Sequence, residues 1–151
     1  MAAPPGAKVV AASVSVTAQG VKVPFGTVEW DSGSFFATSA PRRLRVPGSQ
    51  AGRYLTQLAV RYIALSDPAS PPVDPTSSYY YAEILVNDQV PGNDARSTVA
   101  RVPHATGTTQ LIVYEANLAA GDRLQARLWH DFPDQVRADV SFQTRRIGDS
   151  S

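Results

Sequence analysis

The stretch that decides the fold runs from Arg42 to Leu65 and reads RRLRVPGSQAGRYLTQLAVRYIAL. In residues 43–46, leucine and valine alternate with arginine, and Pro47-Gly48 ends this short strand. A longer run begins at Gly52, where one parity carries Tyr54, Leu58, Val60 and Tyr62 and the other carries Gln57 and Arg61. Alternation of period two predicts half-buried strands. The second run spans about a dozen residues where roughly 5–6 are typical, so it predicts a large antiparallel sheet.

Length and composition fit one globular domain. The chain has 151 residues, 43% of them hydrophobic, which suffices for a single core. The net charge is +1, from 14 basic and 13 acidic side chains, and this balance predicts no binding to nucleic acid or to an anionic membrane. Cysteine is absent, so disulfides and zinc–thiolate sites are excluded. No apolar run approaches the ~18 residues that span a bilayer, and the N-terminus lacks a signal-peptide pattern. We therefore expect the protein to remain in the cytoplasm of the cell that makes it, or to leave that cell only by assembly and lysis.

Alternating patterns elsewhere predict further strands and no helix. We expect strands over residues 10–16, 21–30, 79–87, 96–102, 110–118, 123–130 and 136–143. The run Gln110–Leu118 is so apolar that burial on both faces is expected. Eight or nine strands at this spacing predict a β-sandwich or barrel spanning residues 9–147, with a flexible arm over residues 1–8 and a tail over residues 148–151. The proline-rich segment 66–78 is expected to be a loop.

Three motifs, in this order, resemble the C1q/TNF-like jelly roll over roughly residues 25–147. The first is Val46-Pro47 followed by Gly52-Arg53-Tyr54, at the entry to the long strand. The second is ILVN over residues 84–87, where Asp88 stands in place of the family's turn glycine. The third is LAAGDRL over residues 118–124, which is similar to a late turn of the family. The resemblance implies an all-β, single-domain antiparallel sandwich of ten strands that forms a homotrimer. Similar domains also occur in bacteriophage virion proteins.

Two groups of polar residues are candidate metal sites. His130 and Asp131 with Asp134 offer an imidazole and two carboxylates, which could ligate a cation or move a proton. Asp88, Asn93 and Asp94 offer oxygen ligands of the kind that calcium prefers. Both groups lie in predicted turns, where such side chains commonly cap backbone amides, and we favour that interpretation. The sequence therefore predicts no cofactor, with calcium as the open alternative.

Catalytic patterns are weak. His104 follows a proline in a predicted loop and has no partner that the sequence can place. No Gly-x-Ser-x-Gly motif occurs, so nothing marks a nucleophile of the α/β-hydrolase type. We therefore predict that the chain is not an enzyme, while a small hydrolase or metal-dependent enzyme remains a third hypothesis.

Aromatic and basic residues on strands are the candidate interface. At least one ring of Tyr79, Tyr80 and Tyr81 must face outward, and the parity of Trp129 places it with outward arginine and glutamine. Such rings could stack on a sugar or pack between subunits, and we favour the subunit contact. Arg43 and Arg45 are expected to pair with carboxylates of a partner.

These observations favour a structural role. The leading hypothesis is a trimeric capsid decoration or cement protein of a bacteriophage, assembled in the host cytoplasm into the virion. Its partners would be further copies of itself and a major capsid protein or another virion protein, which trimers would bridge without chemistry. The alternative is a trimeric receptor- or glycan-binding head domain of a tail or fibre protein.

Overall fold

We describe a computed structural model over residues 4–64, 79–100, 107–131 and 136–150. Ten strands and one short 3₁₀ helix follow one another in the order β1 Gly6–Val16, β2 Val21–Lys22, β3 Thr27–Ser32, β4 Leu44–Arg45, β5 Gly52–Ala64, β6 Tyr79–Val86, η2 Asn93–Ala95, β7 Arg96–Ala100, β8 Gly107–Leu118, β9 Arg123–His130 and β10 Val136–Gly148. In this part of the chain no helix is long and apolar enough to cross a membrane. The predicted loop 66–78 lies outside the described residues.

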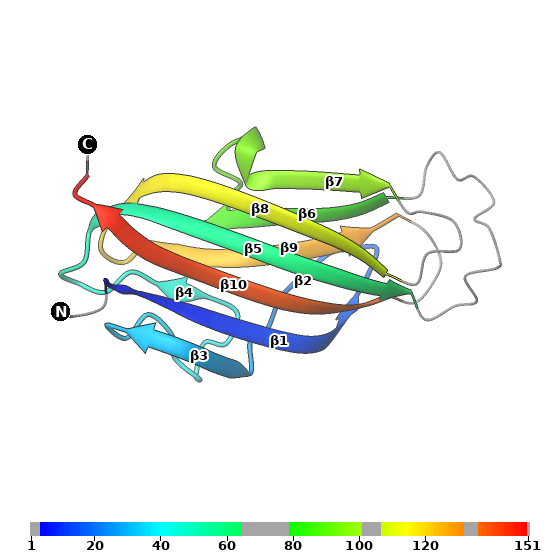
Figure 1. The fold of residues 1–151 in the computed structure, drawn as a ribbon, viewed down its shortest axis with the longest axis horizontal. Helices are drawn as coiled ribbons and strands as arrows, with labels where there is room; N and C mark the ends of the chain where they lie inside the picture. The colour runs from blue at the N-terminus through cyan, green and yellow to red at the C-terminus, as the bar shows by residue number, and fades with distance from the viewer. Residues whose placement is uncertain (1–3, 65–78, 101–106, 132–135, 151) are drawn as a thin grey trace.

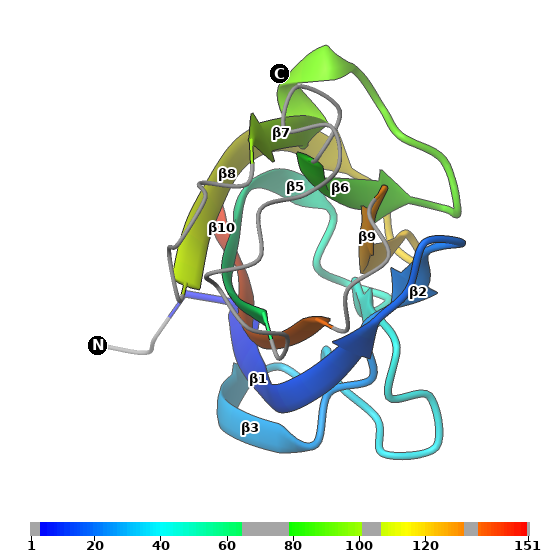
Figure 2. The same ribbon diagram turned by 90° about the vertical axis from the view of Figure 1, so that its right-hand side faces the viewer.

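The strands form two antiparallel sheets that lie face to face (Figures 1 and 2). Sheet A has the order β3-β1-β10-β5-β8, and sheet B has the order β2-β9-β6-β7, with β4 also paired to β9. The long predicted strand is confirmed as β5, which pairs with β10 on one side and with β8 on the other. Most neighbouring strands are distant in sequence, such as β1 and β10, and this arrangement is the jelly-roll sandwich that the resemblance implies.

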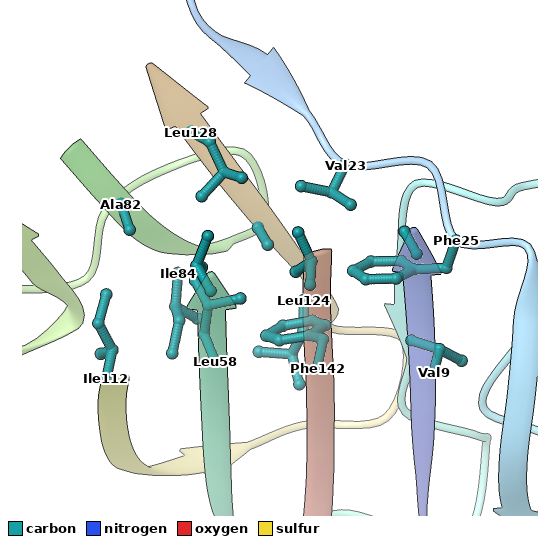
Figure 3. Close-up of a cluster of buried hydrophobic side chains, with 14 of the residues drawn as sticks. Val9, Val23, Phe25, Leu58, Ala82, Ile84, Ile112, Leu124, Leu128 and Phe142 are labelled. Atoms are coloured by element: carbon teal, nitrogen blue, oxygen red, sulfur yellow. The ribbon is translucent and has the colours of Figure 1, made fainter. Parts of the chain in front are cut away.

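The core fills the space between the sheets, and the parity predicted from the sequence decides which side chains enter it. The alternating positions of β5, among them Tyr54, Leu58 and Tyr62, are fully buried. Figure 3 shows Leu58 and Phe142 of sheet A pointing toward Ile84 and Leu124 of sheet B. Phe142 also stacks on Phe25, with 5.7 Å between ring centroids. Because β5 and β10 each bury one face here, a slip of one residue would exchange core and surface side chains along the whole length of either strand.

The expected strand over residues 21–30 is wrong as a single element. Residues 21–22 form β2, which pairs with β9 in sheet B, whereas β3 pairs with β1 in sheet A. Pro24 lies between the two and cannot donate a hydrogen bond to a ladder, so the chain leaves one sheet there and joins the other.

The expected arm over residues 1–8 is shorter than predicted. β1 begins at Gly6, which pairs with Arg145 of β10 and with Ser32 of β3. A side-chain Cβ at Gly6 would lie 2.2 Å from the Thr144 carbonyl oxygen, so a residue without a side chain lets the backbones approach. Gly6 lies inside the expected arm, and it instead starts a strand.

The turn after β6 uses Asn87 and Asp88 in the left-handed region, with φ of 53° and 67°. Val86 and Gln89 exchange both backbone hydrogen bonds across it, at 2.8 and 3.1 Å. This is a two-residue hairpin turn of the kind that favours Asn-Gly. Asp88 occupies the position of the glycine, so the altered motif keeps the geometry of the turn.

Candidate association surface

Exposed apolar side chains gather on one of the two sheets. In the described part of the chain, five large hydrophobic residues are exposed, and all belong to strands of sheet A: Val28 and Trp30 on β3, Leu111 and Val113 on β8, and Ile147 on β10. Leu111 is 61% exposed and Val113 is 48% exposed. Exposed apolar groups of this size that gather on one sheet are typical of association surfaces.

The expectation that β8 is buried on both faces is therefore wrong. Ile112 points into the core, whereas Leu111 and Val113 point outward. β8 is the edge strand of sheet A, and no layer covers its outer face in the described structure. The apolar run of β8 therefore contributes to two different surfaces: Ile112 to the core, and Leu111 and Val113 to the outer face of the sheet.

Four of these five apolar residues occupy the two opposite edges of sheet A, and Ile147 lies on the central strand β10. β3 forms one edge and β8 forms the other, with β1, β10 and β5 between them. Trp30 is paired with Lys8 and Leu111 with Ala59, and both partners point away from the core. Each edge thus presents a bulky apolar group on or beside the outer face.

Small side chains line the middle of this face. Ala12, Ala59 and Ser141 lie around a shallow hollow of about 370 Å³ that Arg61 and Asp139 border. Arg61 and Asp139 are direct cross-strand neighbours, so the rim is charged while the floor is apolar. An apolar side chain from another molecule would fit this hollow and lose little polar hydration.

The outer face of sheet B carries the aromatic residues predicted from the sequence. Tyr81 and Trp129 are cross-strand neighbours whose rings stack at 4.9 Å between centroids and 5° between planes. Partial burial raises the pKa of the Tyr81 hydroxyl, and its hydrogen bond to Asp131 raises it further. Tyr79 lies beside Tyr81, with 6.3 Å between centroids. Both tyrosines and Trp129 are half-buried.

Tyr80 is the one candidate interface residue that the fold removes from the surface. Its side chain is only 2% exposed and stacks on Tyr62 in the core, at 4.3 Å between centroids. The Tyr62 hydroxyl donates to Gln110 Oε1 at 2.7 Å, and burial raises its pKa strongly. Tyr80 is therefore a core residue, as its alternation with Tyr79 and Tyr81 requires.

The arginines Arg43 and Arg45 flank the buried Leu44 of β4. Arg45 is exposed beside a hollow lined by Ser34, Pro47 and Gly121, and Arg43 is half-buried. They belong to neither the outer face of sheet A nor the aromatic cluster of sheet B.

The structure does not bring the first candidate metal group together within the described residues. His130 is buried and its Nε2 lies 3.1 Å from the Val16 carbonyl oxygen. Asp131 accepts from the Tyr79 backbone amide at 2.7 Å and from the Tyr81 hydroxyl. His104 and Asp134 lie outside the described residues.

The second candidate metal group uses its main carboxylate in ion pairs. Asp88 pairs with Lys22 at 2.7 Å and with Arg123 at 3.1 Å, and the hydrogen bond from Lys22 is the main cause that lowers its pKa. Asn93 and Asp94 lie on η2. Across the ranges that the structure describes, no three His, Cys, Asp or Glu side chains are grouped as metal ligands.

The exposed apolar residues of β3 and β8 were not predicted from the sequence. One signal was present, because Leu111 and Val113 share a parity opposite to that of Ile112, Tyr114 and Leu118. What the sequence did not contain was the position of β8 at an edge, which only the topology provides.

Comparison with known proteins identifies the fold. No family model and no curated protein sequence matches the chain. Among solved structures, the globular domain of the zebrafish complement 1qA protein superposes with a TM-score of 0.65 at 10% identity, over 98% of this chain and 100% of that one. The structure of Eiger TNF from S. frugiperda gives a TM-score of 0.53 at 14% identity, over 99% and 96% of the two chains. The chain therefore adopts the C1q/TNF-like jelly-roll fold.

Proposed function

We propose that the protein is a non-enzymatic structural protein that assembles as a homotrimer through the outer face of sheet A. The observation that carries this proposal is the placement of all five exposed large hydrophobics of the described residues on strands of that sheet. Two different apolar edges on one protomer form a heterologous contact, in which β3 of one copy meets β8 of the next. Contacts of this type close into a ring when the rotation between copies allows it.

The dimensions of sheet A suit such a contact. Strands of about 12 residues at ~3.3 Å per residue, and four spacings of ~4.8 Å, give a face of about 40 by 20 Å, or about 800 Å². A stable interface buries about 800 Å² per partner. A ring gives each protomer two contacts, so they share this face of about 800 Å², and the edge side chains of β3 and β8 would supply the remaining area.

Within this structural role, we place the trimer on a bacteriophage capsid as a decoration protein. The support is that the motifs resemble the C1q/TNF-like jelly roll and that domains similar to it also occur in bacteriophage virion proteins, together with a mechanism that requires no catalytic group. A trimer that lies across neighbouring capsid subunits would add buried area and resist internal pressure. Its contacts with the capsid would come from the surfaces that sheet A leaves free.

A cross-linking experiment tests the ring arrangement. Because the chain has no cysteine, Trp30→Cys and Val113→Cys introduce the only thiols. The two positions lie on opposite edges of sheet A, so a bismaleimide shorter than the width of the sheet cannot join them within one protomer. The double variant should give covalent dimers and trimers, whereas each single variant should stay monomeric on a denaturing gel. Dimers from a single variant would indicate a two-fold contact and contradict the ring.

The capsid location requires a separate test. Antibodies raised against the purified chain should label intact phage heads from the producing host by immunogold electron microscopy. Labelling confined to tails would contradict the capsid role. The same holds if particles stay unlabelled although mass spectrometry detects the protein in the lysate of the cells that produce them. Neither result would bear on the trimer.

A further inference from the structure

The outer face of sheet B carries two adjacent rows of side chains that run across three strands. The first row is Thr98, Tyr81 and Trp129, from β7, β6 and β9. The second row is Arg96, Glu83 and Arg127, from the same three strands. Residues two apart on a strand share a face, so the rows lie side by side on the surface.

The charged row holds two arginines that are only partly satisfied by their shared carboxylate. The Glu83 side chain is 1% exposed, while those of Arg96 and Arg127 are 51% and 40% exposed. Arg96 donates through Nε and Nη2 to Oε2 at 2.9 and 2.7 Å, and Arg127 donates through Nε to Oε1 at 2.8 Å and through Nη2 to the same oxygen. This geometry leaves Nη1 of each guanidinium for another acceptor. Two cations and one anion leave a charge of +1.

The aromatic row lies against the charged row and borders a groove with it. The Arg127 guanidinium lies over the Trp129 ring, 5.3 Å from the centroid, and Trp129 stacks on Tyr81. The groove has a volume of about 280 Å³ and is lined by Tyr81, Glu83, Arg96, Thr98 and Trp129 among others. It therefore combines the apolar surface of two rings, the exposed Thr98 hydroxyl and the Nη1 donor of Arg96.

We infer that this groove binds an acidic saccharide, a sugar that carries a carboxylate. The carboxylate accepts hydrogen bonds of the strong charge-assisted kind from Arg96, the arginine that lines the groove. The C–H surface of the sugar lies against Tyr81 and Trp129, and a sugar hydroxyl bonds to Thr98. Asp131 is hydrogen-bonded to Tyr79 and Tyr81 beyond the aromatic row, so repulsion directs the carboxylate toward Arg96.

This site goes beyond the proposed assembly and does not depend on it. It lies on the sheet opposite to the association surface, so a monomer and a trimer both present it. In a trimer, three copies would act together on a polymeric saccharide and raise the apparent affinity without new contacts.

Calorimetric titration with a glucuronic-acid oligosaccharide tests the inference. Binding is expected for the acidic form and not for the same oligosaccharide with its carboxylates reduced to alcohols. Arg96→Gln should weaken binding roughly tenfold or more, the effect of losing a charged hydrogen bond. The matched control is Arg42→Gln, which removes the same charge from an exposed turn and should leave binding unchanged. Because Arg96→Gln also disturbs Glu83, Thr98→Phe provides a second variant that fills the groove and keeps both ion pairs.

Several results would overturn the inference. Equal binding of the reduced oligosaccharide would exclude carboxylate recognition, and equal losses in the Arg96 and Arg42 variants would indicate a general charge effect. Complete competition by acetate or phosphate at similar concentrations would show a simple anion site rather than a saccharide site. Unaltered binding by Thr98→Phe would place the ligand elsewhere.

Discussion

Leu111→Ala is expected to weaken self-association strongly while leaving the protomer intact. The change removes three carbons, worth about 2.4 kcal/mol at ~0.8 kcal/mol per buried CH₂. Since the side chain is 61% exposed in the protomer, a contact that buries it fully would gain about 1.5 kcal/mol from that fraction. A ring has three such contacts, so the trimer loses about 4.5 kcal/mol.

The assay is light scattering over a dilution series. The concentration at which half of the protein is dissociated varies with the square root of a monomer–trimer constant, so 4.5 kcal/mol raises this midpoint roughly 40-fold. The matched control is Gln89→Ala, which shortens an exposed side chain of similar length in the turn after β6 and should leave the midpoint unchanged. The unfolding free energy of the dissociated Leu111→Ala protomer should stay within about 0.5 kcal/mol of wild type. A midpoint shifted less than about twofold, with association intact, would refute the assignment of β8 to the interface.

Three further predictions concern the protomer. Glu83→Gln leaves two arginines without their buried partner and should lower the free energy of unfolding in urea by about 3 kcal/mol. The control Glu115→Gln breaks an exposed pair with Arg53 and should lower it by less than about 0.5 kcal/mol. Equal losses in the two variants would contradict the role of burial. Burial raises the pKa of Tyr62 in the folded state, so its contribution to stability is complete below the unfolded pKa of ~10 and is lost as pH rises above that value. The Tyr62→Phe variant should therefore lose stability less steeply above pH ~10, by up to about 1.4 kcal/mol per pH unit. An unchanged slope would exclude this tyrosine as the cause of the loss. Gly52→Ala places a Cβ 2.7 Å from the Gly148 carbonyl oxygen and should destabilise the protein by about 1–3 kcal/mol. The control Gly48→Ala has no atom within 4 Å of the new Cβ and should leave stability unchanged. Similar effects of the two substitutions would contradict the packing described between β5 and β10.

The strands and their faces could be predicted from the sequence because period-two patterns report directly on burial. The alternation of Tyr54, Leu58 and Tyr62 is enough to identify the core face of β5, and all three side chains are buried. The same parity argument separates Tyr80 from its two neighbours. Local patterns of this kind depend on geometry that every strand shares.

Strand neighbours could not be predicted from the sequence because pairing in a jelly roll joins distant segments. β1 pairs with β10, and β5 pairs with both β10 and β8, so edges and centres depend on the complete topology. Pro24 shows the same limit, since a proline marks a break but does not say that the chain changes sheet there. The apolar side chains of Leu111 and Val113 therefore predict burial as long as the position of β8 at the edge of the sheet is not known.

The candidate sites could be predicted only in part, because parity gives the face of a side chain whereas strand pairing decides its neighbours. Parity placed Trp129 on an outer face and required at least one ring of Tyr79, Tyr80 and Tyr81 to face outward, and the register makes Tyr81 and Trp129 a stacked pair. Glu83 was not singled out, because only pairing with β7 and β9 brings Arg96 and Arg127 to it. Asp88 was a candidate calcium ligand, and its engagement by Lys22 and Arg123 depends on contacts between strands far apart in the chain.

The central claim is that the outer face of sheet A joins copies of this chain into a closed trimer. Size-exclusion chromatography with multi-angle light scattering measures it most directly, on the wild-type chain at concentrations well above the dissociation midpoint. A mass of three times 16.2 kDa that does not grow with concentration is the predicted result. A stable mass of 16.2 kDa would contradict the claim, and so would a dimer, because two-fold contacts do not join the opposite edges of one sheet.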